Sequence, residues 1–133
     1  MQPRANLFYA LWPDDATRAG LVKLQTQLRG RLTRQPNLHL TLAFLGPQPD
    51  ALQPLLRSIL TRLEFTPMTL EINRVGHFPK NRIAWAGMHE TPSALAQLQR
   101  TLTQELARKG IRSDNDRAYR PHITLARDAE PRD

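Results

Sequence analysis

A chain of 133 residues is long enough for one domain with an adequate hydrophobic core. It contains no cysteine, which excludes disulfides and zinc sites built from thiolates and favours a cytoplasmic protein. No segment has the roughly 20 apolar residues needed to span a bilayer, and the first residues do not resemble a secretory signal. The net charge of +7 comes mainly from scattered arginines, which weakly favours anionic partners.

The first half of the chain predicts strands and helices in alternation. Residues 6–12 are rich in aromatic and aliphatic side chains and predict a buried strand. An aspartate at 14–15 can cap a helix over residues 16–29, in which leucines recur at helical spacing and which Gly30 is expected to end. A strand over residues 39–46 follows, and a second helix with an apolar face is expected over residues 50–64.

The second half of the chain predicts two strands, a helix and a final strand. The expected elements are a strand over residues 68–74, a turn over 77–81, a strand over 82–88, a helix from a Ser93 cap to Lys109-Gly110, a polar loop over 112–120 and a strand from His122. The chain shows no linker and no clean internal repeat. This order predicts a single α+β domain.

Two short segments share one pattern of histidine, aliphatic residue, threonine and aliphatic residue. They are His39–Leu42 and His122–Leu125, and they contain two of the four histidines in the chain. Polar and apolar residues alternate in both, as they do in half-buried strands. Because successive side chains on a strand point to opposite faces, the histidine and the threonine of each copy share one face.

Such a pair is suited to proton transfer at an oxyanion. A single copy would usually be a solvated strand without chemistry, but two copies that face one cleft supply an acid and a base. Histidine serves in either role near neutral pH, since its ordinary pKa is about 6.5. The hydroxyls of Thr41 and Thr124 can donate hydrogen bonds to oxygens on which charge develops.

The motifs and their surroundings resemble one enzyme family. The segment 37–46 reads Asn-Leu-His-Leu-Thr-Leu-Ala-Phe-Leu-Gly, and the segments 4–13, 76–79, 82–85 and 117–127 are also similar to that family. The chain thereby resembles the 2H phosphoesterases, and within them most closely the RNA 2′,3′-cyclic phosphodiesterases, once called 2′-5′ RNA ligases.

The resemblance implies a two-lobed α+β fold, with two small, largely antiparallel sheets that face a central cleft and helices outside. Residues 1–133 are expected to form one such domain, without the C-terminal strands that family members usually have. We expect a monomer, with an incomplete sheet edge as the place where a second chain could pair.

The resemblance also implies a role for each site residue in the hydrolysis of RNA 2′,3′-cyclic phosphate ends to 2′-phosphomonoesters. His39 is the expected proton donor to the leaving 3′ oxygen, and His122 the expected acceptor that activates water. Thr41 and Thr124 assist, and Arg127 is a substrate-binding candidate. By strict alternation, however, Arg127 lies on the face opposite His122 and needs a bend to reach the cleft. Neither a metal nor another cofactor is expected.

The remaining histidines and aromatic residues are weaker candidates. His77 and His89 are interpreted as surface or structural residues. Trp12 and Trp85 are expected in the core more than as platforms for a base. Four further aromatic residues stand near segments that resemble the cleft, and any one of them could stack on a terminal base: Phe8, Tyr9, Phe78 and Tyr119.

Three alternative functions stay open from the sequence. One is a phosphodiesterase for small cyclic nucleotides or for 2′-5′ linkages, which includes reversible 2′-5′ RNA ligation. Another is an RNA-binding module without catalysis. A metal site built on the two histidines is disfavoured, because no further ligand stands at a suitable spacing beside either motif.

Overall fold

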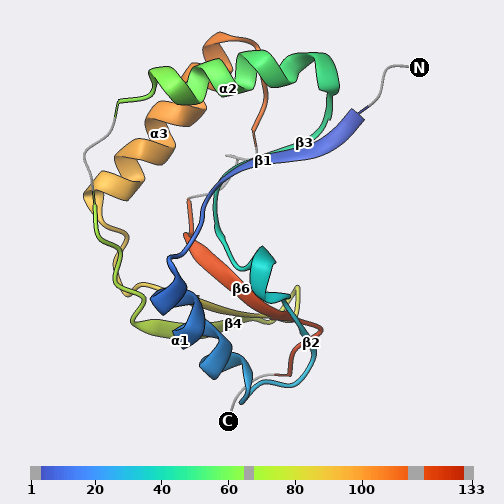
Figure 1. The fold of residues 1–133 in the computed structure, drawn as a ribbon, viewed down its shortest axis with the longest axis vertical. Coiled ribbons are helices and arrows are strands. Elements are labelled where there is room, and N and C mark those ends of the chain that lie inside the picture. The colour runs from blue at the N-terminus through green and yellow to red at the C-terminus, as the bar shows by residue number, and fades with distance from the viewer. Residues whose placement is uncertain (1–3, 65–67, 114–118, 131–133) are drawn as a thin grey trace. The chain divides into compact units, whose positions relative to one another are not determined.

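The structure, a computed structural model, describes residues 4–64, 68–113 and 119–130 (Figure 1). The chain folds as two compact units. Unit 1 contains the chain up to Tyr9, Leu42–Leu70 and Thr91–Arg120, and unit 2 contains Ala10–Thr41, Glu71–Glu90 and Pro121–Asp133. Both units contain helices and strands, and the strand pairs of unit 2 are antiparallel, which confirms the expected α+β class. No helix among the described residues is long and apolar enough to cross a membrane.

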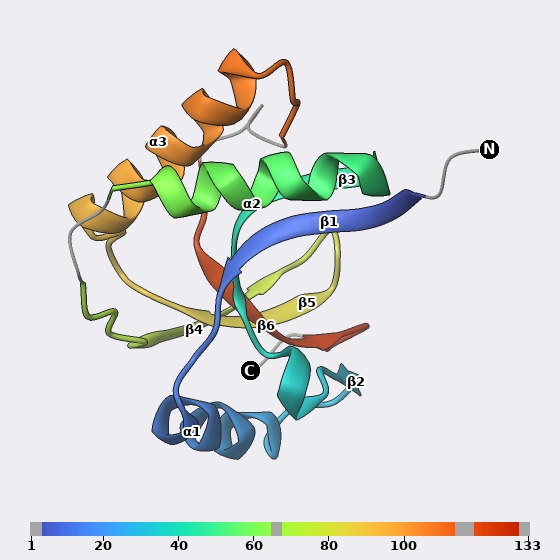
Figure 2. The same cartoon turned by 45° about the horizontal axis from the view of Figure 1, so that its top comes forward.

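Unit 2 is built around strand β6 (His122–Arg127), which carries the second motif. Strand β5 (Ile83–Gly87) pairs antiparallel with β6, and β4 (Arg74–Phe78) pairs antiparallel with β5, as Figure 2 shows. Two further strands pair antiparallel with β6. They are β2 (Arg31–Leu32) and, through its first residue, β3 (Leu40–Pro49). The strand of the second motif is therefore the centre of the unit.

Helix α1 (Asp15–Gln25) packs against β6 in unit 2. Its N-cap is Asp14, whose carboxylate accepts a hydrogen bond from the Thr17 N–H at 2.8 Å. Hydrogen bonds from the side chain and the backbone of Thr17 lower the pKa of Asp14. At the other end, the buried Gln25 donates from Nε2 to the backbone oxygens of Thr33 and Leu125, at 2.8 and 3.0 Å. These bonds tie the helix to β6 and to the residue after β2.

Helix α1 ends four residues earlier than the sequence predicts. Beyond Gln25 the chain closes in shorter turns, in which the N–H of Leu28 bonds the oxygen of Gln25 at 3.0 Å. Gly30 does not end the helix, and instead has φ of 128° next to the end of β6. A Cβ atom there would lie 2.6 Å from the backbone oxygen of Arg127. Gly30 therefore allows a close approach of two backbones.

Unit 1 contains most of β1 (Arg4–Leu11) and of β3, together with helices α2 (Gln53–Arg62) and α3 (Ser93–Arg108). The two helices pack against each other, and the Tyr9 hydroxyl donates to the backbone oxygen of Leu56 at 2.7 Å. Burial raises the pKa of Tyr9. The buried residues of these elements form the core of the unit: Tyr9, Leu42, Leu45, Leu56, Ile59, Leu95, Leu98, Leu102 and Leu106.

Three predicted boundaries differ from the structure. The strand predicted over residues 68–74 is wrong, because β4 starts at Arg74 and pairs along its whole length with β5, so the turn moves to residues 79–82. Helix α3 begins at Ser93 itself, with Pro92 at the cap position. In the predicted loop 112–120, residues 114–118 lie outside the described part of the chain.

Candidate active site

The histidine and the threonine of both motifs lie in unit 2, and their side chains line one pocket of about 440 Å³. Among these lining residues, His39, Thr41, His122 and Thr124 are all half-buried. Leucine and isoleucine alternate with them and are buried. The structure therefore brings the two predicted pairs to one solvent-accessible pocket.

The antiparallel register of β3 and β6 explains this convergence. Leu40 pairs with Ile123, and both side chains are buried on the same face. One residue further along each strand, the antiparallel register places His39 across from Thr124 and Thr41 across from His122. The two histidines are thus diagonal neighbours on adjacent strands, and the backbones of such residues typically lie about 7–8 Å apart. This spacing leaves room for a tetrahedral group between the imidazoles.

The orientation of the His39 ring is fixed by the short helical turn before β3. His39 Nδ1 lies 2.6 Å from the backbone oxygen of Asn37, which is the last residue of the 3-10 turn η1 (Gln35–Asn37). A carbonyl oxygen can only accept, so Nδ1 carries the hydrogen. Nε2 is therefore the nitrogen of His39 that can exchange a proton with a ligand.

Aromatic side chains surround His122 on the same face of the sheet. The ring of Phe78 meets His122 edge-on, with centroids 5.1 Å apart and an interplanar angle of 89°. Trp85 packs against Phe78 at 5.2 Å and lies 6.5 Å from His122. The indole covers Gly76, where an added Cβ would collide with the Trp85 ring. Trp85 is half-buried in this packing, in keeping with its expected structural role.

A β-bulge brings Arg127 to the pocket. Trp85 pairs with Thr124, but Ala84 pairs with Ala126, so β6 has one extra residue opposite β5. Leu125 and Ala126 are consequently buried one after the other, and the alternation of faces shifts by one. Arg127 thereby joins the face of Thr124 and lines the pocket. Strict alternation had placed this arginine on the opposite face, and the bulge is the bend that it required.

Trp12 is not a core residue, contrary to the sequence-based expectation. It is 55% exposed, and its ring lies 5.2 Å from that of His39 at an interplanar angle of 44°. Strand β1 ends at Leu11, and Pro13 follows before the α1 cap. Trp12 thus sits on the connection between two elements and keeps more than half of its surface exposed. The sequence pattern alone cannot distinguish this position from the last residue of a buried strand.

The other candidates lie apart from the pocket lining. His77 Nε2 donates to the backbone oxygen of Ala129 at 3.0 Å, which is a structural contact, and His89 is exposed. Of the four aromatic residues considered for base stacking, only Phe78 belongs to unit 2. Phe8, Tyr9 and Tyr119 belong to unit 1, and burial raises the pKa of Tyr119.

One wall of the pocket was not predicted from the sequence. Four consecutive residues line it, namely Arg31, Leu32, Thr33 and Arg34. Thr33 also fixes this wall to β6, because its N–H donates to the oxygen of Leu125 at 2.9 Å and its Oγ1 donates to the oxygen of Thr124 at 2.8 Å. The two arginines were the available signal, but a two-residue strand has no periodicity by which to recognise it. Within the described residues, no group of three or more histidines and carboxylates could hold a metal ion.

Known proteins resemble this chain in sequence and in fold. Residues 12–133 match the model of a family described as the 2′-5′ RNA ligase superfamily. An Escherichia coli protein named RNA 2′,3′-cyclic phosphodiesterase is 39% identical over 100 residues, which are 75% of this chain and 56% of the E. coli protein. A Thermus thermophilus protein of the same name is 35% identical over 139 residues, which cover 95% of this chain and 70% of that protein.

Solved structures show the same fold. The structure of E. coli LigT complexed with 3′-AMP superposes with a TM-score of 0.86 at 32% identity and covers 96% of this chain and 75% of that one. The structure of TT0787 from T. thermophilus gives a TM-score of 0.76 at 32% identity and covers 92% of this chain and 74% of that one.

Proposed function

Because the chain belongs to the 2′-5′ RNA ligase superfamily, we propose that its pocket in unit 2 hydrolyses 2′,3′-cyclic phosphate ends of RNA to 2′-phosphomonoesters. Curated relatives that carry the name RNA 2′,3′-cyclic phosphodiesterase support this proposal. The observation that carries it is the presence of both His-x-Thr pairs on the wall of one pocket, which offers an acid and a base to the same phosphorus atom.

In the proposed reaction, water attacks phosphorus opposite the 3′ oxygen. His122 accepts a proton from the water as the new P–O bond forms, and His39 donates a proton from Nε2 to the 3′ oxygen as the P–O3′ bond breaks. The hydrogen bond from His39 Nδ1 to Asn37 holds the ring during this transfer. The product is a 2′-phosphate with a free 3′ hydroxyl. Proton exchange with solvent then restores both histidines.

The other polar side chains of the pocket would stabilise the transition state. Negative charge grows on the two non-bridging oxygens as water adds to phosphorus. Thr41 and Thr124 lie across from His122 and His39 and can donate their hydroxyl hydrogens to these oxygens. Arg127 lies on the same face because of the β-bulge and supplies a permanent positive charge. The proposed chemistry needs no metal ion.

The direct test is incubation of a cyclic-phosphate-ended oligonucleotide with the protein and a chelator, followed by phosphorus NMR. We expect a 2′-phosphomonoester, and loss of His39 in His39→Ala should lower the rate by about 100-fold or more. The exposed His89 lies outside the pocket lining, so His89→Ala is the matched control. A purely 3′-phosphate product would reverse the acid and base roles. Unchanged substrate, or equal rates for both variants, would contradict the proposal.

A second candidate is a phosphodiesterase for small nucleotides or 2′-5′ linkages. It is favoured by the existence of an E. coli LigT structure with bound 3′-AMP, a mononucleotide. Rates on mononucleotides, on 2′-5′-linked dinucleotides and on cyclic-phosphate-ended oligonucleotides separate these substrates. RNA binding without turnover of any of them would indicate the non-catalytic module instead.

A further inference from the structure

We propose that Arg31 and Arg34 form a second anion site at the edge of the pocket, which binds the phosphodiester group on the 5′ side of the reacting nucleotide. This inference rests on the proposed function, since it concerns how the same pocket selects its substrate. It implies that the preferred substrate is the end of an RNA strand, with at least one internucleotide phosphate, and not a free cyclic mononucleotide.

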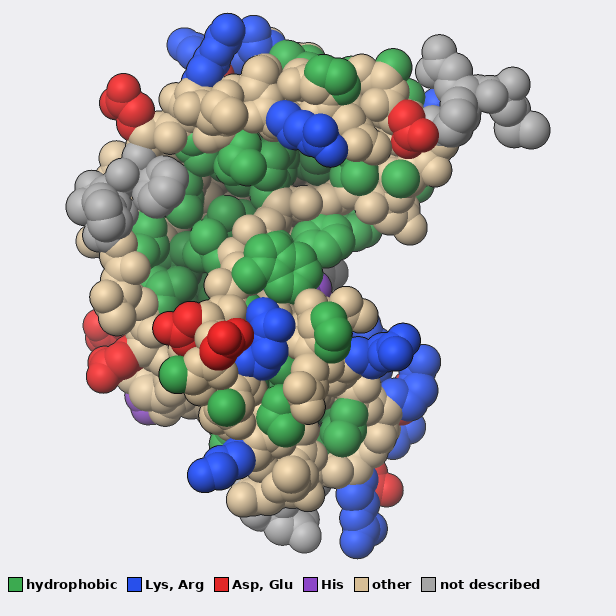
Figure 3. All heavy atoms as spheres, viewed as in Figure 1, with side chains coloured by type: hydrophobic (Ala, Val, Ile, Leu, Met, Phe, Trp, Pro, Cys, Tyr) green, Lys and Arg blue, Asp and Glu red, His purple; other side chains and the backbone are tan. Residues whose placement is uncertain are grey.

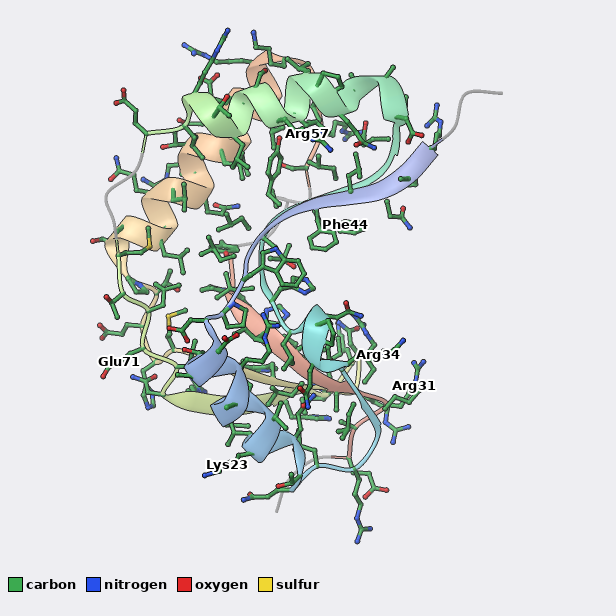
Figure 4. All side chains as sticks on the ribbon, in the orientation of Figure 1. Lys23, Arg31, Arg34, Phe44, Arg57 and Glu71 are labelled. Atoms are coloured by element: carbon green, nitrogen blue, oxygen red, sulfur yellow. The ribbon has the colours of Figure 1, made fainter. Side chains whose placement is uncertain are left out.

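The position of the two arginines is the first argument. Both line the same pocket as His39 and His122, and both come from the wall formed by residues 31–34. Figure 4 shows Arg31 and Arg34 extending from the region of β2, and Figure 3 shows Lys and Arg side chains gathered on that side of unit 2. A pocket of about 440 Å³ is larger than a phosphate group needs and falls in the range of about 300–1,000 Å³ typical of small-molecule sites.

The local charge balance is the second argument. The pocket lining contains three arginines and two histidines but no carboxylate. Arg31 pairs with Arg127 across β2 and β6, and like charges directly opposite each other in an antiparallel pair destabilise it. Asp128 offsets this repulsion only in part, because one carboxylate lies beside two guanidinium groups. A bound dianionic segment of RNA would neutralise the remaining positive charge.

The existing partners of these arginines leave room for such a ligand. Asp128 contacts Arg31 through Nε at 2.5 Å, and both side chains are exposed. In the described part of the chain, Arg31 makes no other ion pair and Arg34 makes none. The terminal nitrogens of a guanidinium match two phosphate oxygens in a bidentate contact. Asp128 can thus orient Arg31 while its outer edge binds phosphate.

The test compares three substrates that share one reacting group. They are adenosine 2′,3′-cyclic phosphate, the dinucleotide ApA with the same cyclic end, and that dinucleotide with a neutral methylphosphonate link. We expect the wild-type kcat/KM to be about tenfold higher for the charged dinucleotide than for the other two, as one charge-assisted contact would produce. Arg34→Gln should remove this preference, so that kcat/KM for the charged dinucleotide falls about tenfold relative to that for the neutral methylphosphonate dinucleotide. Added salt should also reduce the preference.

The controls separate this inference from the proposed function. Arg57→Gln removes an arginine of α2 in unit 1 and should leave all three rates unchanged. Equal wild-type rates on all three substrates, or an equal loss on all three in Arg34→Gln, would overturn the second anion site while the hydrolase remains. If no substrate turns over, the proposed function fails. In that case the affinities of the 2′-phosphate forms of the charged and neutral dinucleotides test the site, and equal affinities would refute it.

Discussion

Gln25 provides a sharp test of how unit 2 is held together. Its side chain is 5% exposed, and Nε2 donates to the backbone oxygens of Thr33 and Leu125. Gln25→Met keeps a straight side chain of similar length but removes both donated hydrogen bonds. The backbone oxygen of Leu125 still accepts a hydrogen bond from the Thr33 N–H, whereas the backbone oxygen of Thr33 loses its bond from Gln25. The change therefore removes two bonds and leaves one partly buried carbonyl, that of Thr33, without this donor.

The expected cost follows from these contacts. Two neutral hydrogen bonds contribute about 1 kcal/mol each, and a partly buried acceptor that loses its donor adds up to about 2 kcal/mol, so the loss is about 2–4 kcal/mol. With a urea m-value of about 2 kcal/mol per M, the unfolding midpoint should fall by about 1–2 M. The assay is urea unfolding followed by circular dichroism. Gln104→Met, at an exposed position of α3, is the matched control. Equal midpoints for the two variants would refute the assigned role of Gln25.

Three further predictions concern packing, capping and exposure. Gly76→Ala should lower the free energy of unfolding, measured in urea, by about 1–3 kcal/mol, because the new methyl group collides with the Trp85 ring. Its control is Gly20→Ala in α1, where the added methyl meets no neighbour and should raise the free energy of unfolding by about 0.5–1 kcal/mol. Equal effects of the two substitutions would contradict the packing of Trp85 on Gly76. Hydrogen bonds from Thr17 lower the pKa of Asp14 in the folded protein. The charged Asp14 carboxylate therefore stabilises the fold fully above the ordinary carboxyl pKa, and this stabilisation is lost as the pH falls through the lowered pKa. The melting-temperature difference between wild type and Asp14→Ala should shrink on acidification, and a constant difference would exclude the charged cap. Trp12→Ala should change the stability by no more than about 0.5 kcal/mol, and a loss typical of a core residue would contradict its exposed position.

Local patterns were sufficient to predict most elements of the fold. The alternation at residues 122–127 predicts β6, and the spacing of leucines predicts α3, because each pattern reports which face of one element is buried. The segment 68–73 shows the limit of this reasoning. It alternates like a strand, but β5 pairs with residues 74–78 instead, and strand pairing depends on the partner as much as on the segment itself.

The candidate site was predictable only in part, for similar reasons. The two histidines and two threonines follow from a repeated pattern. That they line one pocket depends on the register of Leu40 with Ile123, which no local pattern contains. The orientation of Arg127 depends on an extra residue in β6 relative to β5, and the wall that contains Arg34 depends on how a very short strand pairs with β6. These features arise from contacts between segments far apart in the sequence.

The antiparallel pairing of the two motifs has a consequence for regiochemistry. A local twofold axis through the Leu40–Ile123 pair would exchange His39 with His122 and Thr41 with Thr124. The two imidazoles and the two hydroxyls would then nearly coincide after the rotation. A cyclic phosphate bound in either of two opposite orientations would therefore meet the same catalytic groups. In the proposed reaction, the asymmetric neighbours of the twofold axis, Trp12 beside one imidazole and the Phe78 edge beside the other, would then decide which ribose oxygen departs.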